Sequence, residues 1–352
     1  MLELSNQGSW SAGLYPGFQL NQEFQWTCVI KASFEFDKEG NLTPLHEQPP
    51  IEEIDQHYGK PLETSLKTAN ETAPFKTGSE LYLYGAATPH QENQKVMEVK
   101  LGMTFPDGSS WQKVLRIFGR RTWKGMRFTP RVSEPENIGT PVPLKYELAY
   151  GGIDNDTGQE YEANRAGRGF FSDPTKFSDS ELPQIEVGPK FIKSPKDQPS
   201  PAGFGPLPVF WAPRKDDAGT LDEASAKAGL CPFGDDLKPS FYNVAPRDQR
   251  FETELKGGEI ITLTGFMPEL PPAKPLKLIL PELDHELWKV VGKKQEKIVP
   301  VYDTVVIDVD SRTISMIWRA AIPWSRTESR KSWIILAKDK NYDSEARIKK
   351  AS

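Results

Sequence analysis

Alternating apolar and polar positions dominate the first part of the chain and predict β-strands. Between Phe24 and Phe36 every second residue is apolar, and most of the residues between them are polar. This period of two is typical of a strand with one face on a core and the other in water, because a slip of one residue would invert every side chain. The same alternation over 97–105 and 111–117, on either side of a Pro-Asp-Gly turn, predicts a hairpin. Residues 1–150 are therefore predicted to form an antiparallel N-terminal β lobe.

The stretch Leu144–Gly152 ends this predicted lobe. It reads Leu-Lys-Tyr-Glu-Leu-Ala-Tyr-Gly-Gly and alternates as far as Tyr150, which predicts a half-buried strand. The two glycines then predict a tight turn, because a residue without Cβ reaches backbone conformations that a tyrosine cannot. One interpretation is an ordinary strand end, and the alternative is the signature of a protein family.

Residues 151–256 carry a different pattern, rich in glycine, proline and aromatic residues. Eleven prolines lie between Leu182 and Pro246, and proline cannot donate to a sheet ladder, so this stretch is not predicted to form the middle of a sheet. Aromatic residues are interleaved with the prolines, which favours ordered loops packed on the two lobes, and loops of this kind often carry function. The one helix predicted here is short, at 221–228, and ends at Gly229.

Strand patterns resume at Gly257. Apolar or alternating runs predict strands at 259–265, 276–280, 286–291, 304–309, 313–318 and 333–337. Residues 257–352 are thus predicted to form a C-terminal β lobe with a charged tail. The fold class that follows is mainly β, with two antiparallel, sandwich-like lobes joined by a long Gly/Pro-rich loop segment and few short helices.

Composition narrows the class of protein. The net charge of −5 and the pI of about 5.6 lack the basic excess of a general nucleic-acid binder. No apolar run approaches the roughly 18 residues of a membrane helix, and residues 1–10 lack the basic and apolar regions of a signal peptide. Cys28 and Cys231 lie too far apart for a metal-ligand motif, and Cys28 is expected in a core. We expect a folded cytoplasmic protein that binds neither nucleic acid nor membrane.

Sequence signatures of common active sites and cofactor sites do not occur. The chain has no phosphate-binding loop, no His-Glu-x-x-His, no Cys-x-x-Cys and no Gly-x-Ser-x-Gly. The acidic pairs Asp154/Asp156 and Asp235/Asp236 are interpreted as turn formers. The histidines at 46, 57, 90 and 285 are predicted on the surface or in loops. No catalytic residue, no metal ligand and no cofactor is predicted.

The nine tryptophans are the remaining candidates for a binding surface. Three of them lie on the apolar faces of predicted strands and are expected in cores, namely Trp26, Trp111 and Trp318. Three others lie in predicted loops and are candidates for an exposed platform, namely Trp10, Trp211 and Trp324. Exposed aromatic rings on a β scaffold stack on sugars or anchor a protein contact, so both interpretations stay open.

Short motifs follow one another along the chain in an order that resembles a known family. They are Lys31-Ala-Ser-Phe-Glu-Phe, Gly40-Asn-Leu-Thr-Pro, Tyr84-Gly-Ala-Ala, Lys113-Val-Leu-Arg-Ile-Phe-Gly, Tyr146-Glu-Leu-Ala-Tyr-Gly-Gly, the stretch 164–170, Pro201-Ala-Gly-Phe-Gly-Pro, Trp211-Ala-Pro-Arg, and Phe241-Tyr-Asn-Val-Ala-Pro with Asp248-Gln249. In this order, over roughly residues 24–320, they resemble the effector adaptors or chaperones of bacterial type VI secretion. That family was long described as a domain of unknown function, and it is encoded beside spike, PAAR-type tip and effector proteins. Arg120 and Arg165-Ala166 depart from the family pattern without disturbing the order.

The resemblance implies a non-enzymatic cytoplasmic helper. Such a protein binds a secreted effector, at or near its PAAR region, and promotes loading of the effector onto the spike. The implied partners are the effector, a PAAR-type tip protein or a spike protein. The loop residues predicted to contact the partner are Tyr150, Asn164, Arg168, Phe204, Trp211, Arg214, Tyr242, Asn243, Asp248 and Gln249.

Three alternatives remain open at this point. Each of the ten residues could instead hold the loops in shape, since glycine- and proline-rich loops depend on such contacts. The nine tryptophans and many acids also suit a carbohydrate-binding or carbohydrate-cleaving β protein. The third alternative is a structural subunit of the secretion apparatus that travels with the spike.

Overall fold

The computed structural model describes residues 2–338 except 22, 127–128, 178, 189–190, 221–235 and 324–331. Strands dominate it, so the prediction of a mainly β fold is confirmed. The helix predicted at 221–228 lies outside the described residues, as do Trp324, Cys231 and Asp235. Cys28 is buried, as predicted.

Among the described residues, the largest sheet has seven strands and contains the longest strands. Its order is β17 (Arg250–Phe251), β7 (Ser79–Tyr84), β22 (Val301–Asp308), β23 (Thr313–Pro323), β3 (Phe24–Phe36) and β2 (Ser11–Phe18), with β4 (Leu42–Pro44) also on β3. Only β7 and β22 run parallel in it. The hairpin predicted at 304–318 is the β22–β23 pair.

Two further sheets complete the scaffold. A five-stranded sheet has the order β16 (Ile185–Val187), β10 (Ser110–Phe118), β9 (Val96–Thr104), β18 (Ile260–Thr264) and β19 (Leu276–Ile279). A four-stranded sheet has the order β1 (Leu2–Asn6), β24 (Ser332–Ala337), β20 (Glu286–Val291) and β21 (Lys294–Ile298). The hairpin predicted around the Pro-Asp-Gly turn is the β9–β10 pair, which is confirmed.

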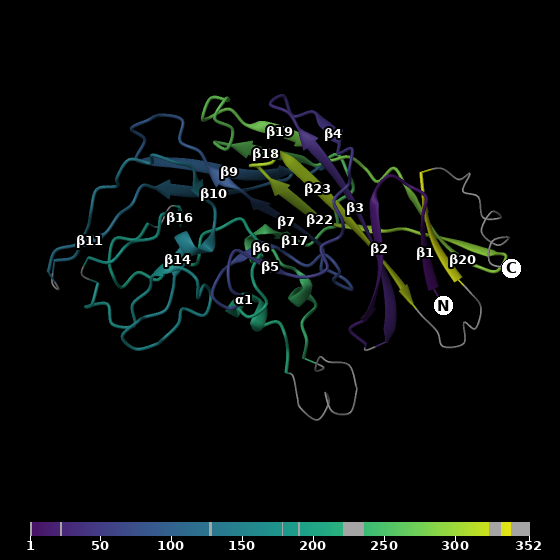
Figure 1. The fold of residues 1–352 in the computed structure, drawn as a ribbon, viewed down its shortest axis with the longest axis horizontal. Coiled ribbons are helices and arrows are strands. Elements are labelled where there is room, and N and C mark those ends of the chain that lie inside the picture. The colour runs from purple at the N-terminus through teal and green to yellow at the C-terminus, as the bar shows by residue number, and fades with distance from the viewer. Residues whose placement is uncertain are drawn as a thin grey trace.

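Short elements decorate these sheets. Four two-stranded pairs are β5 (Gln56–His57) with β6 (Leu66–Thr68), β8 (Ala86–Ala87) with β13 (Val142–Pro143), β11 (Trp123–Lys124) with β12 (Arg131–Val132), and β14 (Tyr150–Gly151) with β15 (Arg168–Gly169). The described helices are α1 (Ala212–Lys215) and the 3₁₀ turns η1 (Tyr146–Leu148), η2 (Pro239–Tyr242) and η3 (Arg247–Gln249). Figure 1 shows the four-stranded sheet beside the N-terminus, and β11, β14 and β16 at the opposite end of the molecule.

Each of the three large sheets draws strands from both 1–150 and 257–352. The predicted lobes 1–150 and 257–352 therefore do not correspond to separate sheets. One apolar core joins all three sheets, with Ile30 from β3, Leu101 from β9 and Ile334 from β24 in the same cluster. Alternation along one strand identifies the strand but not its neighbours, which is why sequence patterns could not give this arrangement.

The polar face of β3 is buried from Gln25 to Ser33, and the prediction that it faces water holds only at Glu35. Segment 48–74 lies over it and satisfies its polar groups: Gln25 donates to the Pro74 carbonyl oxygen at 2.8 Å, and Lys31 pairs with Glu71 at 2.8 Å. On the neighbouring strand, the Arg319 guanidinium donates to the carbonyl oxygens of Glu71 and Ala73, at 2.7 and 3.0 Å. Buried polar groups need such partners, and here a loop supplies them.

Two other sequence predictions need correction. Leu144–Tyr150 is not a strand: η1 occupies its middle and β14 starts only at Tyr150. Trp10 and Trp211 are buried, not exposed. His285 lies in a loop, as predicted, and is buried against Asp284, with 2.6 Å between Nδ1 and Oδ1. Of the three tryptophans predicted in cores, Trp318 is buried, and Trp26 and Trp111 are partly buried against the core.

Candidate functional site

The Tyr146–Gly152 motif and the motif at 164–170 meet in one structural unit. Strand β14 pairs with β15 in parallel, so that Tyr150 lies opposite Arg168 and Gly151 opposite Gly169. Asn164 is fully buried at the centre, where its Nδ2 donates to the carbonyl oxygens of Tyr146 at 2.8 Å and Tyr150 at 3.0 Å. These two bonds explain why 144–150 bends into a 3₁₀ turn instead of extending as a strand.

Gly151 is required at this junction for two reasons. Its φ of 149° lies in the region that side chains rarely adopt, and a Cβ built there would come within 2.1 Å of the Asn164 carbonyl oxygen. The Gly152 N–H donates to that same oxygen at 2.8 Å. The Gly-Gly pair therefore serves a close backbone approach as well as a turn.

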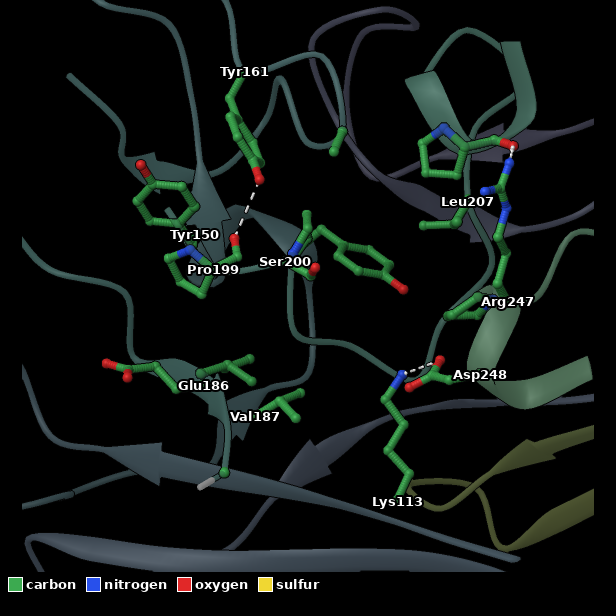
Figure 2. Close-up of a pocket in the computed structure, with 17 residues that line it drawn as sticks. Lys113, Tyr150, Tyr161, Glu186, Val187, Pro199, Ser200, Leu207, Arg247 and Asp248 are labelled. Carbon is green, nitrogen blue, oxygen red and sulfur yellow. Dashed lines mark hydrogen bonds and ion pairs between the residues drawn. The ribbon is translucent and has the colours of Figure 1, made fainter. Parts of the chain in front are cut away.

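This unit forms one wall of a cavity of 610 Å³ (Figure 2). Three tyrosines, four prolines and four aliphatic side chains line it, namely Tyr146, Tyr150, Tyr161, Pro199, Pro201, Pro213, Pro246, Ala163, Ile185, Val187 and Leu207. We call this cavity the Tyr/Pro pocket. Figure 2 shows Tyr150 and Tyr161 across the pocket from Lys113 and Asp248. Its size is typical of ligand sites, which span about 300–1,000 Å³.

Lys113 lies at one side of the pocket and forms hydrogen bonds with two polar side chains. It projects from β10, and its buried Nζ lies 2.9 Å from Asp248 Oδ1 and 2.8 Å from Gln249 Oε1. Gln249 in turn donates to the carbonyl oxygens of Leu81 and Phe204, at 2.7 and 2.8 Å. Burial lowers the pKa of the Lys113 amine, and the Asp248 carboxylate partly offsets this shift. The Lys113 motif and the Asp248-Gln249 motif thus meet at the wall formed by η3.

Glu186 is the second buried charge of the lining. Its carboxylate accepts a hydrogen bond from Arg121 and another from the Ile192 N–H at 2.9 Å. Arg121 also stacks on the Phe118 ring, with its Cζ 3.6 Å from the ring centroid. Burial lowers the pKa of this guanidinium, and Glu186 opposes the shift. Both buried charges of the pocket therefore have partners within the protein.

The sequence-predicted contact residues divide by burial. Seven are buried, namely Tyr150, Asn164, Phe204, Trp211, Arg214, Asn243 and Gln249. Arg168 and Tyr242 are half-buried, and the Asp248 side chain is 56% exposed. Of the ten, only Tyr150 and Asp248 line the Tyr/Pro pocket.

Several of the buried residues hold the loops together. Arg214 donates to the carbonyl oxygens of Leu207 at 2.9 Å and Phe241 at 3.3 Å. Asn243 Oδ1 accepts from the Thr77 N–H at 3.1 Å. In this conformation Arg214 and Asn243 hold the loops in shape. A direct contact with a partner stays a prediction for all ten residues, of which Tyr150 and Asp248 line the Tyr/Pro pocket.

Sequence reasoning missed most of the pocket lining. Tyr146 was noted within a motif, and the prolines were noted as loop formers, but neither was predicted to line a cavity. Tyr161 and Arg247 were not singled out at all. The available signal was the density of proline and aromatic residues over 182–246, which indicates ordered loops without showing which rings face each other.

Metal-ligand clusters and membrane-spanning helices were looked for among the described residues. Within 2–338 and outside the gaps given above, no three His, Cys, Asp or Glu side chains come together as metal ligands. No helix among the same residues is long and apolar enough to span a membrane.

The chain was compared with known protein families, curated proteins and solved structures. Searches of curated proteins and of solved structures found no match. A family model described as an uncharacterized protein conserved in bacteria (DUF2169) matches residues 21–319, which is most of the chain and includes every element that lines the pocket. The chain therefore belongs to the DUF2169 family of bacterial proteins.

Proposed function

We propose that this protein is a non-enzymatic adaptor or chaperone that holds a protein client in the Tyr/Pro pocket. The observation that carries the proposal is the character of the lining: rings and aliphatic groups dominate, and the buried charges Lys113 and Glu186 already have internal partners. A site that must process a polar substrate keeps reactive groups available to it, whereas an apolar, ring-lined site suits capture of a peptide segment.

The client we propose is an effector of bacterial type VI secretion, bound at or near its PAAR region. The ordered sequence motifs support this, because they resemble the effector adaptors of that system. The partners would then be the effector itself, a PAAR-type tip protein or a spike protein, and the adaptor would work in the cytoplasm before secretion. Burial of Trp10 and Trp211 removes two of the three tryptophans that suggested a sugar platform.

The experiment is a tagged pull-down from the native bacterium, with bound proteins quantified by mass spectrometry. We expect one effector, PAAR-type or spike protein in near-equal amount with the wild-type protein. Val187→Arg, which places a charge on the pocket wall, should abolish recovery. Ile279→Arg is the matched control, because Ile279 is an exposed apolar residue (62%) at the opposite edge of the same sheet. Equal recovery with both variants would refute the pocket as the docking site, and absence of any such partner would refute the adaptor function.

A further inference from the structure

The Tyr/Pro pocket has a neutral, apolar interior. Lys113 is neutralised by Asp248, and Glu186 is neutralised by Arg121. Lys113, Arg121 and Glu186 are buried, so a cation that displaced Lys113 or Arg121, or an anion that displaced Glu186, would leave a buried charge unpaired, which is strongly unfavourable. The interior of the pocket therefore favours an uncharged part of a ligand.

The walls are flat rings held in fixed positions. The Tyr146 hydroxyl donates to the Gly205 carbonyl oxygen at 2.9 Å, and the Tyr161 hydroxyl donates to the Pro199 carbonyl oxygen at 3.3 Å. Tyr150 and Tyr161 pack edge to face, with ring centroids 5.1 Å apart. With their hydroxyls bound to the chain, Tyr146 and Tyr161 offer ring surface more than hydrogen bonds. Aromatic grooves of this kind take extended polyproline segments, which lose little conformational entropy on binding.

Arg247 supplies an available cation at the rim. Its side chain is 61% exposed, and its contacts are long, at 3.3 Å to the Pro213 carbonyl oxygen and 3.4 Å to Asp217. Asp217 also accepts from Ser240 at 2.9 Å and from Lys238 at 3.2 Å, so it keeps partners when Arg247 turns away. A carboxylate beside the apolar part of a ligand can therefore pair with Arg247 without leaving a buried charge unpaired.

We propose that the Tyr/Pro pocket binds an extended, proline-containing segment of the client that carries an acidic residue next to its apolar stretch. The proline rings lie on the tyrosine and proline walls, and the acidic side chain pairs with Arg247. This inference rests on the proposed adaptor function and names the chemistry of the segment that the adaptor recognises.

The test uses a display library of random twelve-residue peptides, selected on the immobilised full-length protein. We expect enrichment of proline together with Asp or Glu. The enriched peptides are then synthesised with a fluorescent label and titrated by anisotropy. Binding should weaken more than about tenfold for Val187→Arg, which places a long charged side chain on the apolar wall, and should be unchanged for Ile279→Arg.

The rim contact is tested separately with Arg247→Gln. This variant should weaken the acidic peptides by about two- to fivefold, as expected for a solvent-exposed ion pair. For this variant, the acidic peptides should bind no more tightly than versions in which Lys replaces the acidic residue. Replacing the prolines by alanine should weaken binding to the wild-type protein.

Three results would overturn the inference: a selection without binders, binders without proline enrichment, or peptides that bind Val187→Arg as tightly as the wild-type protein. The pull-down shows whether only the proposed proline-containing segment is wrong or the adaptor function is wrong as well. A native client recovered with the wild-type protein leaves the adaptor function standing even when the selected peptides contradict the proposed segment.

Discussion

Replacing Asn164 by aspartate tests whether one buried amide organises the wall of the pocket. The change is nearly isosteric, so it leaves no cavity, but it removes the two N–H donors that Asn164 offers to the carbonyl oxygens of Tyr146 and Tyr150. Among the described residues, Oδ1 of Asn164 has no hydrogen-bond partner. Both oxygens of the introduced carboxylate would thus lie without donors, and one would face two carbonyl oxygens.

The cost follows from these lost bonds. The Tyr146 oxygen keeps the Ala149 N–H as a donor, at 3.0 Å, so the cost falls on the Tyr150 oxygen and on the introduced carboxylate. Each buried acceptor left without a donor costs about 1–3 kcal/mol, so these two cost about 2–6 kcal/mol at neutral pH. This is a large part of the roughly 5–15 kcal/mol that stabilises a domain. The carbonyl oxygens should also raise the pKa of the introduced carboxyl in the folded state. The penalty is therefore full above that folded pKa and falls as the pH drops through it, because the protonated acid can donate one hydrogen bond.

Urea unfolding followed by tryptophan fluorescence measures the difference, at pH 7 and at pH 5. We expect Asn164→Asp to lose about 2–6 kcal/mol relative to the wild-type protein at pH 7 and less at pH 5. The control is Asn137→Asp, since Asn137 is exposed and its amide reaches only Asn93, at 3.3 Å. An Asn164→Asp variant no less stable than this control would show that the amide does not hold the two motifs together.

Three further perturbations test the surrounding contacts. Gln249→Ala removes three hydrogen bonds, one of them from the Lys113 ammonium. It should lower the free energy of unfolding by about 3–5 kcal/mol in the same urea assay. A loss below about 1 kcal/mol, the scale of one ordinary hydrogen bond, would show that Gln249 does not hold Lys113 and the two carbonyl groups together. Hydrogen bonds from the Ser172 hydroxyl and the Ser172 N–H lower the pKa of Asp154 to about 2, so the stability that this carboxylate provides is complete above its ordinary pKa of 3.8 and is lost as the pH falls through 2. In Asp154→Asn the urea midpoint should fall less between pH 4.5 and pH 2 than it does in the wild-type protein. An equal fall in both proteins would show that Asp154 does not provide this pH-dependent stability. Trp211 is 1% exposed, so Trp211→Ala should cost about 3–5 kcal/mol of stability, and a normally stable variant would contradict its burial.

Local pattern predicted the strands better than their partners. The alternation at 24–36 and around the Pro-Asp-Gly turn gave β3 and the β9–β10 hairpin, because side-chain period follows directly from strand geometry. The same alternation failed at 144–150, where the Asn164 amide draws two carbonyl groups inward and bends the chain. That partner lies 14 residues or more further along the chain, and no periodicity reports it.

For the candidate site, too, the sequence predicted the segment but not the contacts between distant residues. Gly/Pro/aromatic density pointed to the loop segment that supplies most of the Tyr/Pro pocket. It could not separate the rings that face the cavity from those that fill the core, such as Phe204 and Trp211. The contact between Lys113 and Gln249 joins residues 136 positions apart, and only the folded chain brings them together.

The central claim is that a secretion client occupies the Tyr/Pro pocket, and site-specific photocrosslinking in the native bacterium tests it most directly. A benzophenone amino acid replaces Val187 at the pocket wall, 37% exposed, or Ile279 at the opposite edge of the same sheet. We predict that the probe at 187 crosslinks to an effector, PAAR-type or spike protein and that the probe at 279 does not. Crosslinks to such a protein from 279 but not from 187 would contradict the account.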